Sequence, residues 1–379
     1  MKKVLFVFGT RPEAIKLAPV IKAFKKESCF FLSKVCVTAQ HRELLDQVLN
    51  IFDITPDWDL HIMKEDQNLF DVTTSVILRM ENVLSEFNPD LVFVQGDTTS
   101  SFASALAAFY KQIPVAHIEA GLRTYNIYSP WPEEMNRQII SRISAFHFAP
   151  TEESSQNLLK EGIPVEKILI TGNTIIDSLN IALNRIKERK PVIPGFPGEE
   201  ISQGDKLIIV TSHRRENFGK GLESICRAVV RLADKYPDVH FIYPVHFNPN
   251  IRKTVNNFLI ADKRKNVHLI KPLEYLPFIA LMERASVIVT DSGGIQEEAP
   301  CLGKPVLVTR KVTERPEGLA SGIIKIVGTD EELIVSETTK LLEDFRYYRK
   351  RSKKANLYGD GKASLRILNF IKDHFLAIS

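Results

Sequence analysis

Short apolar runs rich in β-branched residues alternate with longer amphipathic patterns along almost the whole chain of 379 residues. A strand that is apolar on both faces must be buried on both faces, and such strands separated by helices are typical of a parallel sheet. This alternation restricts the chain to the α/β class. The expected strands form two series: 3–9, 33–39, 90–96, 114–120, 145–150 and 167–172, then 205–213, 239–246, 266–270, 285–291, 305–310 and 322–328.

A segment rich in Pro and Gly, 190–200, separates the two series. The length of the chain also favours two domains over one. We therefore expect two doubly wound, Rossmann-like domains, an N-terminal one over 1–172 and a C-terminal one over 173–361. The remaining residues, 362–379, are expected to form a helix that packs on either domain, one alternative being a return to the N-terminal domain.

The composition argues against several classes of partner. The net charge is only +4, and basic residues concentrate only in 346–356, so a nucleic-acid partner is not expected. The four cysteines are scattered without a Cys-x-x-Cys pair, which is typical of reduced thiols. The first apolar run stops at Gly9, and no run approaches the roughly 18 apolar residues of a membrane span. We therefore expect a cytoplasmic protein that does not bind a membrane.

Polar and charged residues follow the expected strands of both series. In an open parallel sheet, ligands bind beyond the carboxyl ends of the strands. Because the strand-end residues come from both halves, we expect the active site in the cleft between the two domains. These residues are Gly9, Thr10, Arg11, Gln40, His41, Gly96, Asp97, Glu119, Ser212, His213, Arg214, His246, Asp291, Ser292, Gly293 and Gly294.

The turn after the strand 285–291 combines two signals that seem opposed. Ser292, Gly293 and Gly294 open a helix, and free amides at a helix start suit a phosphate. Glu297 and Glu298 follow one turn later, and a carboxylate accepts hydrogen bonds from a neutral diol. A nucleotide diphosphate satisfies both signals, with phosphate at the helix start and ribose further along.

Two further turns carry cations. Arg11 and Lys16 lie at the start of the first expected helix, while His213 and Arg214 follow the first strand of the second series. Exposed amides and cations suit a phosphate, although a structural turn with surface charges explains the first pair equally well. Glu119 is harder to explain structurally, because an unpaired carboxylate at the end of a buried strand is costly.

Several common cofactor motifs are missing from the sequence. No Gly-x-Gly-x-x-Gly follows the first strand, no phosphate-binding Gly-x(4)-Gly-Lys-Ser/Thr loop occurs, and no Gly-x-Ser-x-Gly is present. No set of His, Asp or Glu has convincing metal spacing. We therefore expect no cofactor and no metal, so that carboxylates, a histidine and arginines supply the chemistry.

Eight motifs, taken together, resemble one family. In chain order they are "FGTRPEAIK", "QGDTTSSFASALAAFY", "HIEAGLRT" with "YSPWPEEMNR", "GNTIIDSL", "SHRRENFG", "YPVHFNPN", "DSGGIQEEAP" and "TERPEG". From residue 3 to about 365 the chain resembles the non-hydrolysing bacterial UDP-N-acetylglucosamine 2-epimerases. The resemblance implies two domains arranged as in GT-B glycosyltransferases, with UDP held mainly by the second domain, and a homodimer that serves polysaccharide biosynthesis.

The resemblance also implies the reaction. UDP-N-acetylglucosamine and UDP-N-acetylmannosamine interconvert by elimination of UDP to 2-acetamidoglucal and re-addition of UDP, without a metal or nicotinamide. Such a site needs cations for the departing UDP, a carboxylate for the proton on carbon 2 and a proton donor on the opposite face. Which carboxylate acts on which face stays open. The catalytic residues are Asp97, Glu119, Glu133 and His213, and the UDP-sugar contacts are Arg11, Lys16, His213, Arg214, Phe278, Ser292, Gly293, Gly294 and Glu298.

The family also binds a second UDP-N-acetylglucosamine as an activator, near residues that match 39–45 here. The candidate allosteric residues are Gln40, His41, Glu43 and His246. The chain departs from the family pattern at Glu43, Asp66, Lys311 and Ala320, which leaves activation by substrate and the sugar preference open. The alternatives are a 2-epimerase of a 6-deoxy or diacetamido UDP-sugar, a retaining UDP-sugar glycosyltransferase, a hydrolysing relative and a nucleotide-sugar sensor without activity.

Overall fold

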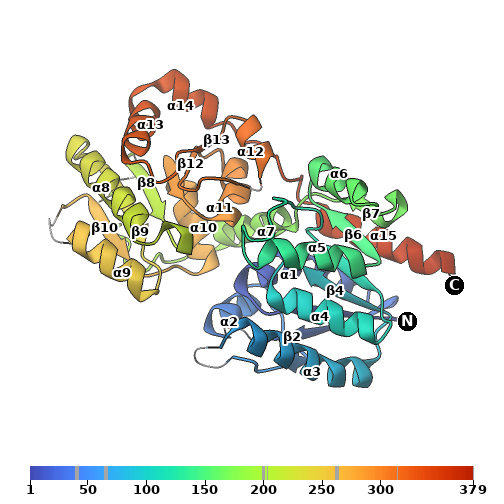
Figure 1. Cartoon of the computed structure of the whole chain (residues 1–379). Helices are drawn as coiled ribbons and strands as arrows, with labels where there is room; N and C mark the ends of the chain where they lie inside the picture. Colours follow the sequence, from blue (N-terminus) through green and yellow to red (C-terminus); the bar gives the residue numbers. More distant parts are fainter. Residues whose placement is uncertain are drawn as a thin grey trace. The chain divides into compact units, whose positions relative to one another are not determined.

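The computed structural model describes residues 1–38, 42–63, 67–198, 201–202, 204–260, 264–313 and 315–378, with the backbone alone for 42–44, 215, 260 and 378. The chain forms two compact units (Figure 1). Unit 1 comprises Met1–Asn180 and Tyr358–Ser379, and unit 2 comprises Ile181–Leu357. Within the described ranges, no helix combines the length and the apolar character that a membrane crossing needs.

Unit 1 is built on a parallel sheet with the strand order β3-β2-β1-β4-β5-β6-β7. The order reverses between β1 and β4, which is the position where open α/β sheets bind ligands. The strands are β1 (Lys2–Phe8), β2 (Phe31–Val37), β3 (Trp58–Asp59), β4 (Leu91–Gln95), β5 (Val115–Ile118), β6 (Phe146–Ala149) and β7 (Ile168–Ile170). The helices are α1 (Arg11–Lys26), α2 (Arg42–Ile51), α3 (Leu69–Phe87), α4 (Thr99–Tyr110), α5 (Glu133–Ile143), α6 (Glu152–Lys160), α7 (Thr174–Glu188) and α15 (Ala363–Ile378).

Unit 2 repeats the plan with the order β10-β9-β8-β11-β12-β13, again parallel and again reversing beside its first strand. The strands are β8 (Lys206–Thr211), β9 (Val239–Pro244), β10 (Val267–Ile270), β11 (Val287–Thr290), β12 (Val306–Val308) and β13 (Ile324–Ile326). The α-helices are α8 (Lys220–Lys235), α9 (Pro249–Val255), α10 (Tyr275–Arg284), α11 (Gly293–Glu298), α12 (Pro316–Ala320), α13 (Glu331–Glu343) and α14 (Phe345–Arg351).

The apolar runs of the sequence become the buried centres of both sheets. In β1 the five residues from Val4 to Phe8 are all buried, so the strand is covered on both faces. The ring of Phe6 stacks on Phe93 of β4 at 4.7 Å and meets Phe24 of α1 edge-on at 5.5 Å. These contacts join the two central strands to the helix that covers them. The α/β class and the two Rossmann-like folds expected from the alternation are confirmed.

The expected strands all occur, but β3 was missed because two residues are too short to give a periodic signal. The units also divide at 180/181 and 357/358, not at the expected 172/173 and 361/362. The first turns of α7 pack on unit 1, where Ile176 and Leu179 are buried and Ser178 donates a 2.5 Å hydrogen bond to the carbonyl of Ile15. This packing moves the boundary into the helix.

Candidate functional site

Glu119 follows β5, at the carboxyl edge of the unit 1 sheet. Its carboxylate forms an ion pair with Nζ of Lys16 from α1, and Nε2 of Gln95 at the end of β4 donates to it at 2.7 Å. Only 7% of the Glu119 side chain and 9% of the Lys16 side chain are exposed. The carboxylate of Glu119, whose burial without a partner would be costly, is therefore paired. Lys16, a predicted phosphate ligand, forms an ion pair with this carboxylate.

The backbone of Glu119 has a φ of +64°, in the left-handed region that residues other than glycine rarely occupy. Such a conformation costs about 1–3 kcal/mol and persists where surrounding contacts fix it. Here the ion pair to Lys16 and the hydrogen bond from Gln95 hold the side chain on one side. The same two contacts place the carboxylate between α1 and the end of β4.

Asp97 occupies the neighbouring strand end, after β4. Its Oδ2 pairs with Nη2 of Arg137 at 2.6 Å, and its backbone carbonyl accepts from Nδ2 of Asn136 at 2.9 Å, both from α5. His117 donates through Nε2 to the carbonyl of Gly96 at 2.7 Å. Burial lowers the pKa of His117 to about 3, so this ring is neutral and serves to position the Asp97 turn.

Glu133 and Glu134 open α5, and their surroundings differ. Glu134 is fully buried and accepts at 3.0 Å from the backbone amides of Thr124 and Tyr125, with Arg137 at 3.4 Å. These bonds hold the loop before the helix, which gives Glu134 a structural role. Glu133 is half-buried in the first turn of α5 and follows this loop directly.

Glu13 lies at the same strand ends, although it is not among the residues predicted from the sequence. Its buried carboxylate accepts from the amides of Gly9 and Thr10 (3.2 and 2.8 Å) and from the hydroxyls of Thr98 and Ser101 (2.8 and 2.7 Å). Burial raises its pKa, while these hydrogen bonds oppose the shift. The carboxylate ties together the turns after β1 and β4. The Thr-x-x-Glu capping pattern at this helix start was the available signal.

His213 follows β8 at the carboxyl edge of the unit 2 sheet, beside Asp291 at the end of β11. Nδ1 of His213 lies 2.9 Å from Oδ1 of Asp291. Burial favours the protonated carboxyl, but hydrogen bonds from His213 and from the backbone amides of His213 and Arg214 outweigh it and lower the pKa of Asp291 to about 2. Asp291 is therefore an ionised, buried partner of His213.

Arg214 follows β8 and His246 follows β9, both at the carboxyl edge of the unit 2 sheet. Nε of Arg214 is buried and has no hydrogen-bond partner among the described residues, which leaves a donor for a ligand. The ring of His246 stacks on that of His213 with centroids 6.0 Å apart. Burial, followed by the nearby His213, lowers the pKa of His246. His246 thus neighbours the predicted catalytic histidine, although it was predicted as an allosteric residue.

Arg315, which directly precedes α12, lies against the start of α11. A Cβ added to Gly293 would lie 2.9 Å from Nη1 of Arg315, so only glycine allows this approach. Arg315 in turn pairs with Glu297 at 2.7 Å, and both side chains are buried. Glu297 is therefore held by a buried ion pair. Of the predicted phosphate ligands, the amide of Ser292 already donates to the hydroxyl of Thr290 at 3.0 Å.

Glu298 at the end of α11 contacts α10, the helix that carries Phe278. The hydroxyl of Tyr275 donates to Oε1 of Glu298 at 2.8 Å, and both residues are buried. Phe278 is half-buried one turn further along α10. Tyr275 fixes the orientation of the carboxylate predicted to bind the ribose, and this partner was not predicted from the sequence.

The remaining predicted residues are described in part. Arg11 is half-buried as the first residue of α1. Gln40 and His41 lie outside the described residues, and of Glu43 only the backbone, in α2, is described. Across the described ranges, no three or more His, Cys, Asp or Glu side chains are grouped so that they could hold a metal ion.

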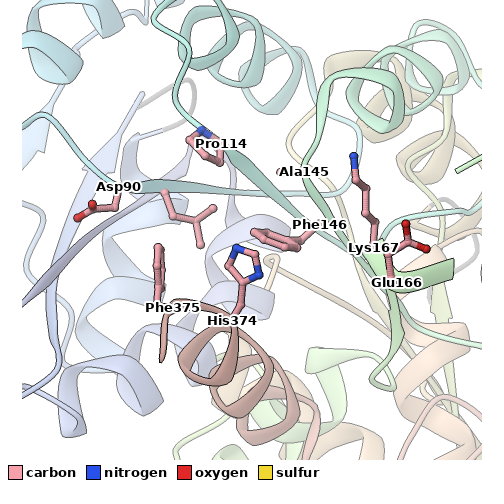
Figure 2. Close-up of a pocket in the computed structure, with 9 residues that line it drawn as sticks. Asp90, Pro114, Ala145, Phe146, Glu166, Lys167, His374 and Phe375 are labelled. Atoms are coloured by element: carbon pink, nitrogen blue, oxygen red, sulfur yellow. The ribbon is translucent and has the colours of Figure 1, made fainter. Parts of the chain in front are cut away.

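A cavity of about 450 Å³ lies at the opposite edge of the unit 1 sheet, as Figure 2 shows. Its walls come from the amino ends of the strands and from α15. The lining residues are Asp90, Leu91, Pro114, Ala145, Phe146, Glu166, Lys167, His374 and Phe375. None of the predicted site residues lines this cavity, since they follow the carboxyl ends of the strands.

Comparison with known proteins identifies close relatives. The family pattern described as UDP-N-acetylglucosamine 2-epimerase matches residues 22–372. A UDP-N-acetylglucosamine 2-epimerase of Neisseria meningitidis serogroup A is 53% identical over 365 residues, which are 96% of this chain and 97% of that protein. The protein of the same name from Escherichia coli is 52% identical over 380 residues, 99% of this chain and all of that one. The crystal structure of the Neisseria meningitidis protein bound to UDP-GlcNAc matches 98% of this chain and 100% of that chain with a TM-score of 0.94 and 52% identity.

Proposed function

This chain belongs to the UDP-N-acetylglucosamine 2-epimerase family, and from that premise we propose that it interconverts UDP-N-acetylglucosamine and UDP-N-acetylmannosamine. The observation that carries the proposal is the desolvated carboxylate of Glu119, paired with Lys16 and held in a strained backbone conformation. A carboxylate fixed at a strand end is suited to removing a proton from a bound sugar.

The hydrogen on carbon 2 of the sugar is not acidic until the bond from carbon 1 to the phosphate weakens. In the proposed reaction UDP leaves, one carboxylate takes the proton from carbon 2 as a base, and the glucal intermediate forms. A second acid returns a proton to the opposite face, and UDP adds again to carbon 1. Asp97, Glu119 and Glu133 are the acids in this scheme, and their order is not assigned.

Unit 2 supplies the nucleotide contacts in this proposal. His213 and Arg214 donate to the diphosphate with the turn Ser292–Gly294, and the buried Nε of Arg214 supports this role. Glu298 accepts from the ribose hydroxyls, and Phe278 lies against the uracil ring. Arg11 and Lys16 complete the cations for the departing UDP.

The proposed reaction is tested by incubating the protein with UDP-N-acetylglucosamine alone in D2O. We expect the manno product, with deuterium at carbon 2 of both sugars. Absence of isotope entry and of product would contradict the epimerase proposal. Transfer that requires an added acceptor would favour the glycosyltransferase alternative, and a panel with 6-deoxy and diacetamido UDP-sugars ranks the related substrates.

A Glu119→Gln variant supplies the control for the isotope experiment. We expect turnover and deuterium entry to fall by about 10²- to 10⁴-fold, because a general acid or base is removed. Binding of UDP should survive, since all the proposed nucleotide contacts except Arg11 and Lys16 belong to unit 2 and the substitution leaves both of these cations in place. Loss of UDP binding in the same variant would instead assign Glu119 a structural role.

A homodimer is also part of the proposal, and unit 1 offers a surface for it. α3 and α4 carry large exposed apolar side chains: Phe70 and Leu78 are 83% and 67% exposed, and Phe109 and Tyr110 are 51% and 67% exposed. Large exposed apolar side chains on adjacent helices are typical of an interface. Sedimentation should give a dimer for the wild type and a monomer for Phe70→Glu combined with Leu78→Glu. A wild-type monomer at micromolar concentration would contradict this part.

The proposal also includes a cytoplasmic location and activation by the substrate. A reducing compartment, the cytoplasm, fits the four free cysteines, Cys29, Cys36, Cys226 and Cys301. Activation by UDP-N-acetylglucosamine through Gln40, His41, Glu43 and His246 would make the rate sigmoidal in substrate. Hyperbolic kinetics over the whole range of substrate would exclude such activation.

A further inference from the structure

Asp291 receives hydrogen bonds from the whole segment that carries His213. The carboxylate is fully buried at the end of β11. Its Oδ2 accepts from the hydroxyl of Ser212 at 3.0 Å, the amide of Arg214 at 2.9 Å and Nδ2 of Asn217 at 3.1 Å. These bonds fix the turn after β8 relative to β11, so the base of the His213 side chain has one position.

The other carboxylate oxygen faces the imidazole ring. Nδ1 of His213 lies 2.9 Å from Oδ1 of Asp291. An ionised carboxylate can only accept, so the hydrogen of this bond is on Nδ1. Nε2 is then the nitrogen that gains or loses a proton. About 38% of the His213 side chain is exposed while Asp291 is not exposed at all, so the ring reaches from a buried anchor toward a ligand.

We propose that Asp291 is a positioning residue that holds His213 with its proton on Nδ1, so that Nε2 is the atom presented to the departing diphosphate. The identity of the ligand rests on the proposed function, whereas the tautomer does not. With Nε2 protonated, the ring carries one positive charge beside the negative charge of Asp291. Nε2–H then donates to a phosphate oxygen as the bond to carbon 1 breaks, and the second N–H stays committed to Asp291.

The tautomer can be measured in the free protein by long-range ¹H–¹⁵N correlation of ¹⁵N-labelled histidine. A His213→Asn variant assigns the signals of His213 among those of the nine histidines. At a pH where the ring is neutral, we expect the proton on Nδ1 and none on Nε2. The opposite tautomer in the wild type would overturn the proposal, and no sugar nucleotide is needed for this measurement.

Asp291→Asn is designed to change the contact with Nδ1 of His213 while it keeps the hydrogen bonds to the other oxygen. An amide oxygen in place of Oδ2 still accepts from Ser212, Asn217 and the backbone amides of His213 and Arg214, whereas the NH2 group in place of Oδ1 donates to Nδ1 of His213. We expect the ring to change tautomer and kcat to fall by about 10²- to 10⁴-fold, with a smaller change in the affinity for UDP. In a His213→Asn background the same substitution should cause little further loss, because the two residues act as a unit.

Asp177→Asn is the matched control. Asp177 is a buried carboxylate of unit 1 that accepts from the amide and hydroxyl of Ser364 at 2.9 and 2.5 Å. We expect it to lower the melting temperature without changing the His213 signals. An unchanged tautomer in Asp291→Asn, or the same change in Asp177→Asn, would overturn the proposal. If Asp291→Asn does not fold, the wild-type tautomer decides, and if the wild type lacks epimerase activity, the tautomer still tests the role of Asp291.

Discussion

Three buried carboxylates of unit 1 show how hydrogen-bond partners separate residues of one type. Glu13 accepts from two amides and two hydroxyls and joins two turns, while Glu134 accepts from two amides and anchors a loop. Glu119 instead faces Lys16 and Gln95, which pair a carboxylate with a cation at a strand end. The side-chain type alone does not distinguish these three carboxylates, whereas their hydrogen-bond partners do.

The neutral state of His117 predicts acid sensitivity of unit 1. Burial lowers its pKa from 6.5 to about 3, so between these values the unfolded chain binds more protons than the folded one. Stability from this group is fully present above pH 6.5 and falls by about 1.4 kcal/mol for each pH unit below it. His117→Gln should flatten the dependence of the unfolding free energy on pH between 4.5 and 6.5, measured by urea denaturation.

His147, the neighbour of His117 across β5 and β6, makes a useful comparison. Burial also lowers its pKa, to about 4, so it contributes to the same loss of stability. The slope should therefore decrease without vanishing in His117→Gln. An unchanged slope would show that His117 is protonated in the folded protein.

At the level of elements, the short helix α11 is organised by a residue from a distant turn. Arg315 precedes α12, yet its guanidinium lies against Gly293 and pairs with Glu297. The two glycines at the start of α11 look equivalent in sequence. In the structure, Gly293 is closed in by Arg315, whereas a Cβ on Gly294 would meet no heavy atom of the described residues within 4 Å.

Substitution of these two glycines should therefore have unequal effects. Gly293→Ala must displace the guanidinium of Arg315 from its buried partner, Glu297, and we expect a loss of about 1–3 kcal/mol in unfolding free energy. Gly294→Ala should change the unfolding free energy by less than about 0.5 kcal/mol. Equal melting temperatures for the two variants would show that Arg315 moves away at no cost.

At the level of the whole molecule, unit 1 is made from both ends of the chain. Figure 1 shows α15 within unit 1, although it is the last helix of the sequence. Lys372 of α15 pairs with Glu27 at 2.6 Å, and Phe375 meets Phe31 of β2 at 6.3 Å. The ring of Phe370 packs edge-on against Phe146 of β6 at 5.7 Å. The C-terminal helix therefore completes the fold that the N-terminal residues begin.

Two isoleucine substitutions test this division. Ile371 of α15 and Ile334 of α13 are both fully or almost fully buried. Truncation of either to alanine should cost about 2–5 kcal/mol through lost burial and the cavity left behind. By hydrogen exchange, Ile371→Ala should raise exchange in α1 and β2, and Ile334→Ala should raise it in α8 and β8. Exchange that rises in the same segments for both variants would contradict the assignment of α15 to unit 1.

The sequence alone determined the α/β class, the two series of strands and the family, because burial on both strand faces and eight ordered motifs are local properties of the chain. It also placed Asp97, Glu119, His213 and Ser292 at strand ends. Only the tertiary structure decided which side chains meet there. The partners of Glu119, His213 and Gly293 are Lys16, Asp291 and Arg315, and the first two pairs join segments that are far apart in sequence. Parallel strands bring such segments to one edge, and a periodic pattern cannot specify which side chains will pair.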